Sequence, residues 1–314
     1  MKLSQNIIIK KYNTLIRDVN MNNNDKLNQR IKLRDGRNLG FAEIGDTDGI
    51  PLFHFHGFPA SRLEALMLSK MITGKKIRFI SVDRPGMGLS DFKKKRRLLD
   101  WPSDIIELAD ELSIDKFAVE GVSGGAPYSI ACAYKIPDRI IACGIICGLG
   151  PLSTEIKKLI NIGPATIFIA RRMNWIFKLI MSRQGRTARN LEKMEVNLKK
   201  GLDELPEPDR VILNDSEFLP LFLQEGSEAF RQGGRGASQD AKIYSQPWGF
   251  NLEDISPNLK VYLFHGELDS IIPVSVGRVV SKMIPNCNST YYPNDGHYSL
   301  TFNHLDDILE SLTS

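Results

Sequence analysis

The stretch VEGVSGGA, residues 119–126, places one serine among three glycines, directly after an apolar run and before a helical one. Glycine weakens strands and helices alike, so the backbone must need unusual freedom here. A strand that turns at once into a helix with serine at the corner forces φ > 0 at that serine and needs small residues two positions to either side. Gly121 and Gly125 meet this need, and Pro127 suits the first helical turn. The stretch therefore predicts that Ser123 projects its hydroxyl at a helix N-terminus, as a nucleophile would. The alternative is a glycine-rich turn with an incidental serine.

Strand-like and helical segments alternate along most of the chain. The strand-like segments are residues 29–33, 38–45, 51–56, 76–83, 116–121, 139–148, 260–266 and 289–293. The first two flank the turn RDGR and predict an antiparallel hairpin. The others alternate with helical segments, which predicts an α/β fold with a mostly parallel sheet of eight strands flanked by helices.

The alternation stops near Gly150 and resumes at Leu259. Between them the sequence is helical, with apolar faces and basic flanks. We therefore expect an N-terminal extension at 1–27, an α/β core formed by 28–150 and 251–314, and an inserted helical cap at 151–250. Some apolar residues of the cap either pack on one another or line a substrate pocket; they are Leu159, Ile162, Ile167, Phe168, Trp175, Ile176, Phe177 and Ile180.

The composition is that of an ordinary soluble globular protein, with 314 residues, 42% hydrophobic and 25% charged. The net charge of +4 is too small to suggest a nucleic-acid-binding protein, and no apolar run approaches the ~20 residues of a membrane span. The N-terminus has only a three-isoleucine apolar stretch, too short for a signal peptide. The cysteines form no CxxC pair and are expected to be free thiols in a reducing, cytoplasmic compartment; they are Cys132, Cys143, Cys147 and Cys287.

A serine hydroxyl needs a general base, and the chain offers five histidines. His297 follows PNDG in a loop after the last strand, from which it can reach the carboxyl edge of the sheet, where Ser123 points. His297 is therefore the predicted base. Structural roles are expected for the others, which are His54, His56, His265 and His304.

The base in turn needs an orienting acid. In HGELDSIIP, Asp269 and Glu267 both follow a strand at the carboxyl edge of the sheet. Asp269 stands next to the turn into the following helix and is the better placed of the two. The predicted chain order is therefore Ser123, Asp269, His297.

An oxyanion intermediate needs two N–H donors. Gly124, directly after the serine, supplies one. The second is predicted in HGFP after the third strand, where Gly57 lets the backbone approach closely and Phe58 offers its N–H.

Five segments in this order resemble motifs of the α/β-hydrolase superfamily with a helical cap. HGFP resembles the oxyanion loop, DRPGMGLSD the loop after the fourth strand, VEGVSGGA the nucleophile elbow, HGELD the acid loop and GH the histidine loop. The resemblance covers about residues 28–312. It implies hydrolysis, most often of carboxylic esters, with no metal or organic cofactor. Ser123 argues against the epoxide and halide chemistry of relatives that carry aspartate at the elbow.

We therefore expect a serine hydrolase, and within that class a carboxylesterase. It is expected to act through an acyl-enzyme on a small-molecule ester with a small apolar acyl group. We expect neither a nucleic-acid partner nor stable insertion into a membrane. Relatives of the superfamily that carry serine at the elbow also cleave thioesters, lactones, prolyl peptides and carbon–carbon bonds. A prolyl-type aminopeptidase would need acidic cap residues for a substrate amine, and Glu225 and Glu228 are the candidates. The non-enzyme alternative is a ligand-binding receptor on the same fold.

Two charged features remain. Glu120 occupies a position before the elbow glycine that is usually apolar in such sequences. A buried carboxylate needs a partner, and His54 on the neighbouring strand is the candidate unless Glu120 reaches solvent.

The basic run KKKRR at residues 93–97 is expected to be a solvated loop. Its alternative role is to draw anionic substrates or lipid surfaces toward the cap entrance.

Overall fold

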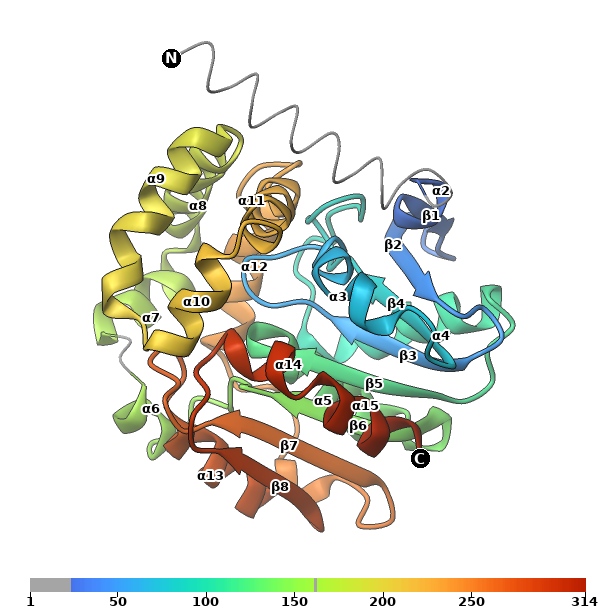
Figure 1. Ribbon diagram of the computed structural model, residues 1–314. Helices are drawn as coiled ribbons and strands as arrows, with labels where there is room; N and C mark the ends of the chain where they lie inside the picture. The colour runs from blue at the N-terminus through green and yellow to red at the C-terminus, as the bar shows by residue number, and fades with distance from the viewer. Residues whose placement is uncertain (1–23, 161–162) are drawn as a thin grey trace.

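A computed structural model describes residues 24–160 and 163–314 of the chain (Figure 1). The described residues form an eight-stranded sheet, as the sequence predicts, and the structure gives its strand order as β1-β2-β4-β3-β5-β6-β7-β8. The strands are β1 (Gln29–Lys32), β2 (Asn38–Gly45), β3 (Ile50–Phe55), β4 (Ile77–Val82), β5 (Phe117–Val122), β6 (Ile140–Ile146), β7 (Lys260–Gly266) and β8 (Cys287–Tyr292). Of the expected N-terminal extension, residues 1–23 lie outside the described residues, and Asn24–Leu27 forms the short helix α2.

The sheet is parallel except at one edge. β1 pairs antiparallel with β2, and β2 with β4, which confirms the predicted hairpin. All other neighbouring strands are parallel. The chain adds β4 on one side of β3 and β5 on the other. In such sheets a ligand crevice forms at the carboxyl ends of the strands where the winding reverses, so the ends of β3 and β5 are the expected place for a site.

Helices cover both faces of the sheet. One face carries α4 (Trp101–Glu111), α5 (Ala126–Lys135) and α13 (Val274–Met283), and the other carries α3 (Glu64–Ile72), α14 (Ser299–Asn303) and α15 (Leu305–Thr313). Successive side chains of a strand point to opposite faces. Leu52 accordingly packs with α3 and α15, and Phe53 packs with α4 and α5.

The segment between β6 and β7 is helical, and its described residues contain no strand. It holds α6 (Ile156–Leu159), α7 (Pro164–Arg172), α8 (Asn174–Ala188), α9 (Leu191–Gly201), α10 (Glu207–Asn214), α11 (Phe218–Ala229) and α12 (Arg235–Tyr244). Figure 1 shows α8 to α11 gathered to one side, over the ends toward which the parallel strands point. We call this segment the cap; its limits at residues 151 and 250 stay a prediction. Across the described residues, no helix has the length and hydropathy of a membrane-spanning segment.

Candidate active site

Ser123 stands at the corner between β5 and α5, where one short helical turn joins strand and helix. Its φ is 54°, the left-handed conformation that the sequence predicts for this corner. Close contacts require the neighbouring glycines. A Cβ on Gly121 would overlap the backbone of Gly125, and a Cβ on Gly125 would overlap the carbonyl of Phe55. The elbow therefore forms for the steric reason inferred from the sequence.

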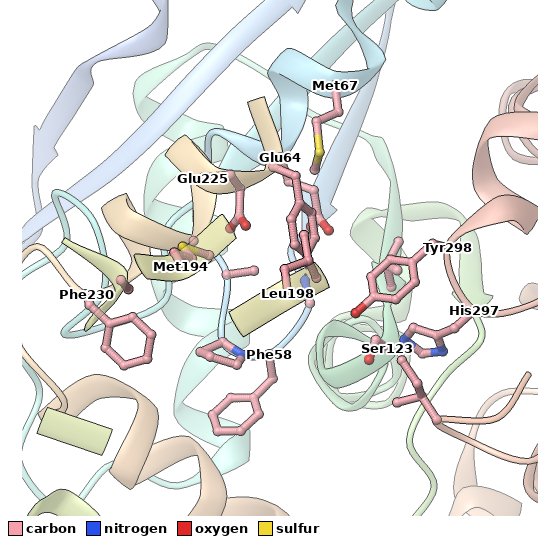
Figure 2. Close-up of a pocket in the computed structure, with 18 of the residues that line it drawn as sticks. Phe58, Glu64, Met67, Ser123, Met194, Leu198, Glu225, Phe230, His297 and Tyr298 are labelled. Atoms are coloured by element: carbon pink, nitrogen blue, oxygen red, sulfur yellow. Dashed lines mark hydrogen bonds between the residues drawn. The ribbon is translucent and has the colours of Figure 1, made fainter. Parts of the chain in front are cut away.

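His297 lies beside Ser123 and is hydrogen-bonded to Asp269. His297 Nδ1 is 2.7 Å from Asp269 Oδ2, and Figure 2 shows the His297 ring next to the Ser123 side chain. Ser123 and His297 line the same cavity. Asp269 Oδ1 accepts hydrogen bonds from the backbone N–H groups of Ile271 and Ile272, at 2.9 and 2.8 Å, which orient the carboxylate. The ends of β5, β7 and β8 thus bring the three predicted residues together.

The charges around His297 and Asp269 favour an ion pair. Burial opposes ionisation of Asp269, but the charge of His297 and the hydrogen bonds from His265 and His297 hold the pKa of Asp269 well below its usual range. Burial likewise opposes protonation of His297, yet Asp269 raises the pKa of His297 above its ordinary value. His265 contributes because its Nε2 lies 3.3 Å from Asp269 Oδ2. The competing acid, Glu267, instead pairs with Arg278 near the surface.

The two predicted oxyanion donors lie side by side. A Cβ on Gly124 would come within 2.5 Å of Phe58 Cβ and 3.4 Å of Phe58 N, so a glycine is needed for this approach. Gly57 directs its own N–H to Glu64 Oε2 at 3.0 Å, which orients the loop after β3. The hydroxyl of Tyr244, from α12, donates to the Gly124 carbonyl at 2.7 Å. Side chains from α3 and from the cap therefore hold the backbone on both sides of the predicted donors.

A buried arginine also holds the loop after β3. Arg84 donates to the carbonyls of His56 and Gly57, the second at 2.7 Å, and to Asp240 Oδ2 at 2.7 Å. Asp240 belongs to α12, so this ion pair ties the cap to the core. Both charged groups are fully buried, and their hydrogen bonds offset the loss of hydration. The sequence does not predict this pair, because no local pattern shows that two residues 156 positions apart meet.

The expectation of a solvated loop at residues 93–97 is wrong for Arg96. The Arg96 guanidinium is buried and donates to Asp240 and to the Tyr128 hydroxyl, the second at 2.7 Å. Burial opposes ionisation of Asp240, but the two buried arginines hold its pKa below the ordinary value. The exposed members of the run are Lys94, Lys95 and Arg97. The run therefore anchors the cap through one of its cations.

Asp209, in cap helix α10, holds the loop that carries His297. Its carboxylate accepts hydrogen bonds from three consecutive backbone N–H groups, those of His297 at 2.8 Å, Tyr298 at 2.9 Å and Ser299 at 2.8 Å. Asp209 is fully buried, and a Cβ on Gly296 would overlap its carboxylate. The sequence does not predict this role of Asp209, because Asp209 lies 88 positions before His297 and carries no local signal of this contact.

Glu120 is buried and paired with His54, as predicted. Glu120 Oε1 lies 2.9 Å from His54 Nδ1, and Glu64 Oε2 lies 2.9 Å from His54 Nε2. Burial opposes protonation of the ring, but the two carboxylates raise the pKa of His54 to about 9. The ring is therefore an imidazolium at neutral pH, and both of its nitrogens donate. Because Glu64 also accepts from the Gly57 N–H, this cluster connects the sheet core to the loop that carries Phe58.

The remaining histidines have structural partners, as expected. His56 Nδ1 is 3.0 Å from the Gly57 carbonyl, and His265 Nε2 is 2.8 Å from the carbonyl of Ile272. His304 Nε2 is 2.8 Å from a carboxylate oxygen of Asp295. None of these three rings lines the cavity that holds Ser123.

A cavity of about 840 Å³ extends from Ser123 and His297 into the cap. Its wall is mainly apolar and includes Met67, Met194, Leu198, Phe222 and Phe230. Two carboxylates, those of Glu64 and Glu225, also face it (Figure 2). Burial and the neighbouring Glu64 charge raise the pKa of Glu225 well above its ordinary value, which favours the neutral form of this carboxyl group.

The apolar cap residues considered from the sequence contribute little to this wall. Ile180 lines the cavity, but Phe168 and Trp175 are exposed at the surface. Ile162 lies outside the described residues. Most apolar cap residues of the wall come from α9 and α11 instead, because the helical period of each segment shows which face is apolar but not which helix turns that face to the site.

Solved structures with several named activities resemble this chain. An esterase from Exiguobacterium antarcticum has a TM-score of 0.67 and 17% identity, over 91% of this chain and 98% of that one. A bromoperoxidase from Bacillus anthracis has a TM-score of 0.65 and 20% identity, over 91% and 98%. A meta-cleavage product hydrolase from Pseudomonas fluorescens has a TM-score of 0.61 and 18% identity, over 91% and 96%. The chain has the α/β-hydrolase fold.

Similarity in sequence is more limited. No family model matches the chain. An uncharacterized hydrolase of Saccharomyces cerevisiae is 29% identical over 113 residues, which are 35% of this chain and 39% of that protein. Proteins named esterase, bromoperoxidase and hydrolase share the α/β-hydrolase fold, so the reaction has to be argued from the site.

Proposed function

We propose that this protein is a serine hydrolase that cleaves carboxylic esters through an acyl-enzyme. The observation that carries the proposal is the position of Ser123, at an elbow with φ of 54°, in a cavity that His297 also lines. His297 is bonded to Asp269 at 2.7 Å. A hydroxyl at a helix N-terminus, a base and a buried acid can act in sequence in such an arrangement.

The proposed reaction has two halves. Ser123 Oγ attacks the ester carbonyl carbon while His297 Nε2 takes the hydroxyl proton, and Asp269 stabilises the resulting imidazolium. The tetrahedral oxyanion accepts hydrogen bonds from the N–H groups of Phe58 and Gly124. His297 then gives the proton to the leaving oxygen, and an alcohol departs from the acyl-enzyme. Water that loses a proton to His297 attacks the acyl carbon by the same path and releases the carboxylic acid and Ser123.

A small-molecule ester with an apolar acyl group is the proposed substrate. The cavity of about 840 Å³ has a mainly apolar wall, supplied largely by the cap, which suits an apolar group and excludes water. The four cysteines are free, which supports the cytoplasm as the proposed location.

A prolyl-type aminopeptidase is the second candidate, because Glu225 and Glu64 face the cavity. A substrate ammonium group needs an ionised carboxylate there that has no other partner. Burial raises the pKa of Glu225 well above its ordinary value, and Glu64 already pairs with His54 at 2.9 Å. Glu228, the other acidic residue considered, pairs with Arg62 at 2.6 Å and with Arg231 at 2.9 Å. These features favour an ester over an amine-bearing peptide.

A fluorophosphonate probe and a substrate panel test these proposals. The probe should label the wild type at Ser123 and should leave Ser123→Ala unlabelled. p-Nitrophenyl esters of increasing acyl length should be hydrolysed by the wild type, and proline p-nitroanilide only weakly. An unlabelled but folded wild type would favour the receptor alternative, and a preference for the anilide would favour the aminopeptidase.

A further inference from the structure

Large apolar side chains are exposed on two helices of the cap. Phe168 on α7 is 57% exposed, and Trp175 and Leu179 on α8 are 64% and 61% exposed. Ile180, the next residue, is 49% exposed. Figure 1 shows α7 and α8 on the side of the molecule that the cap occupies, with α8 next to α9. Side chains of this size are mostly buried in folded proteins, and a group of them at the surface marks a binding face.

Basic residues, and no acidic ones, accompany these apolar side chains. Residues 164–190 contain six arginines and lysines and no aspartate or glutamate. All six are exposed; they are Arg171, Arg172, Lys178, Arg183, Arg186 and Arg189. In the described parts of the chain none of the six forms an ion pair, unlike Lys199 and Arg231 elsewhere in the cap. The positive charge of this region is therefore uncompensated.

The two kinds of side chain share the outward face of α8. Trp175, Leu179, Arg183 and Arg186 follow one another at spacings of four, four and three residues, which places them in one stripe along the helix. The buried residues of α8 lie on its opposite side; they are Met181, Gly185 and Ala188. The stripe is thus apolar at its beginning and basic at its end, and it faces away from the packed interior of the cap.

We propose that the outward face of α7 and α8 docks on an anionic membrane surface. Helices of this kind place aromatic and aliphatic side chains at the boundary between headgroups and acyl chains, while their Lys and Arg side chains contact anionic headgroups. A nucleic acid would engage the cations but would leave the aliphatic Leu179 without a partner.

The docking face borders the candidate site. Ile180 and Arg183 belong to α8 and also line the cavity that holds Ser123. An apolar ester dissolved in the bilayer could therefore enter the cavity without crossing bulk water. This last step rests on the proposed function, whereas docking itself does not require hydrolysis.

Co-sedimentation of the full chain with vesicles tests the proposal. Vesicles that contain phosphatidylglycerol are compared with vesicles of pure phosphatidylcholine, at low and high NaCl. We expect partition onto the anionic vesicles at low salt to exceed partition onto neutral ones by about tenfold or more, and to fall as salt screens the charges. The other two tryptophans, Trp101 and Trp248, are buried. A blue shift of tryptophan emission on binding would therefore report on Trp175.

Two matched variants test how much the exposed apolar side chains contribute to membrane binding. The double variant Trp175→Ser/Leu179→Ser removes two side chains that do not line the cavity and should weaken partition by about tenfold or more. Val211→Ser is its control, because Val211 on α10 is similarly exposed at 57% but lies outside residues 164–190. The control should partition as the wild type does, and both variants should hydrolyse a water-soluble ester at wild-type rates.

A second pair of variants tests how much the basic residues contribute to membrane binding. Arg171→Gln/Arg172→Gln should weaken binding to anionic vesicles by about tenfold, whereas Arg30→Gln/Lys32→Gln removes the same charge from β1 and should leave it unchanged. Ser123→Ala should bind vesicles as the wild type does, so that a failure of docking and a failure of the proposed function are distinguishable.

Several outcomes would overturn the membrane assignment. One is the absence of wild-type binding to anionic vesicles at low salt, and another is equal binding by Trp175→Ser/Leu179→Ser. A dimer in sedimentation velocity that the same double variant dissociates would assign the face to a second copy of the chain. Tighter binding to a nucleic-acid homopolymer than to anionic vesicles would assign it to a polyanion.

Discussion

The backbone N–H of His297 donates a hydrogen bond of 2.8 Å to the carboxylate of Asp209. Asp209 belongs to α10 of the cap, whereas His297 follows β8 of the sheet. The same carboxylate accepts from the next two N–H groups at the start of α14. The position of the proposed base therefore depends on the docking of the cap as well as on Asp269.

The first prediction concerns this contact. Asp209→Ala should lower kcat by about 10²-fold with a smaller change in KM, because a displaced His297 can no longer reach Ser123 in the reactive geometry. Asp209→Asn keeps one acceptor oxygen, so its kcat should fall less. Steady-state kinetics on a p-nitrophenyl ester measures both effects. Asp203→Asn, at an exposed position of the cap, is the control and should behave as the wild type does.

The pH dependence of kcat/KM in Asp209→Asn distinguishes a changed environment of His297 from a loss of folded protein. The charges of Asp269, Asp209 and Glu64 raise the pKa of His297 against the effect of burial. The nearby thiol of Cys147 stays neutral, because burial raises its pKa well above the ordinary value. Asp209→Asn removes one of these negative charges, so the acid limb of kcat/KM should move to lower pH. An unchanged limb would contradict the electrostatic part of this prediction.

The second prediction distinguishes two acids in one loop. Asp269→Asn should lower turnover by about 10³- to 10⁴-fold, because His297 loses the charge that orients its ring and stabilises the imidazolium. Glu267→Gln should have little effect, since Glu267 pairs with Arg278 near the surface. Both variants should keep the far-ultraviolet circular dichroism of the wild type. The reverse ranking of the two rates would show that Glu267 is the acid.

The third prediction concerns the cap residue next to the elbow. Tyr244→Phe removes a hydroxyl that donates to the Gly124 carbonyl at 2.7 Å. Turnover should fall by about tenfold as the N–H of Gly124 loses its fixed orientation toward the oxyanion. Labelling by the fluorophosphonate should remain complete at long times. Tyr134→Phe, in the neighbouring helix α5, is the control, and a similar loss in it would sink the assigned role of Tyr244.

The parts of the fold that the sequence predicts have local causes. The elbow follows from steric crowding between residues four apart, so Gly121, Ser123 and Gly125 are enough to indicate it. The alternation of strands and helices likewise predicts the parallel sheet, and a carboxylate in an otherwise apolar strand led to the pair of Glu120 and His54. In each case the contact is either between near neighbours or across adjacent strands, where register limits the possible partners.

Two contacts that the sequence does not predict cross between the cap and the core. Asp209 meets His297 across 88 positions, and Asp240 meets Arg84 across 156. Asp209 and Asp240, taken alone, are typical of exposed helix positions. Their burial depends on how the cap docks, which the apolar period of the cap helices does not determine. The same uncertainty explains why Phe168 and Trp175, candidates for the cavity wall, lie at the surface.

The fourth prediction tests the buried pair beside the elbow. Glu120→Ala removes the carboxylate 2.9 Å from His54 Nδ1 and should lower the free energy of unfolding by about 3–5 kcal/mol, with the lower end favoured because Glu64 still holds the other ring nitrogen. Glu120→Gln keeps an acceptor and should cost less. Urea unfolding measures both losses. Molecules that remain folded should still react with the fluorophosphonate, and equal stability of Glu120→Ala and the wild type would refute the prediction.

The last prediction is the pH dependence that this cluster gives to stability. Burial opposes protonation of His54, but Glu120 and Glu64 raise its pKa from 6.5 to about 9 in the folded protein. A raised folded-state pKa means that the folded state holds the proton more tightly than the unfolded state does. The stabilisation is therefore fully present below pH 6.5 and is lost as the pH rises through about 9.

A shift from 6.5 to about 9 corresponds to a loss of about 3 kcal/mol across this range. Urea unfolding between neutral and alkaline pH should show the decline in the wild type. His54→Gln cannot take up the proton, so it should be less stable than the wild type at neutral pH and should lose much less stability on the way to alkaline pH. The two curves should converge as the pH passes 9, because the wild-type ring is then neutral as well. Parallel curves would mean that other groups cause the alkaline loss and that His54 is not the charged centre of the cluster.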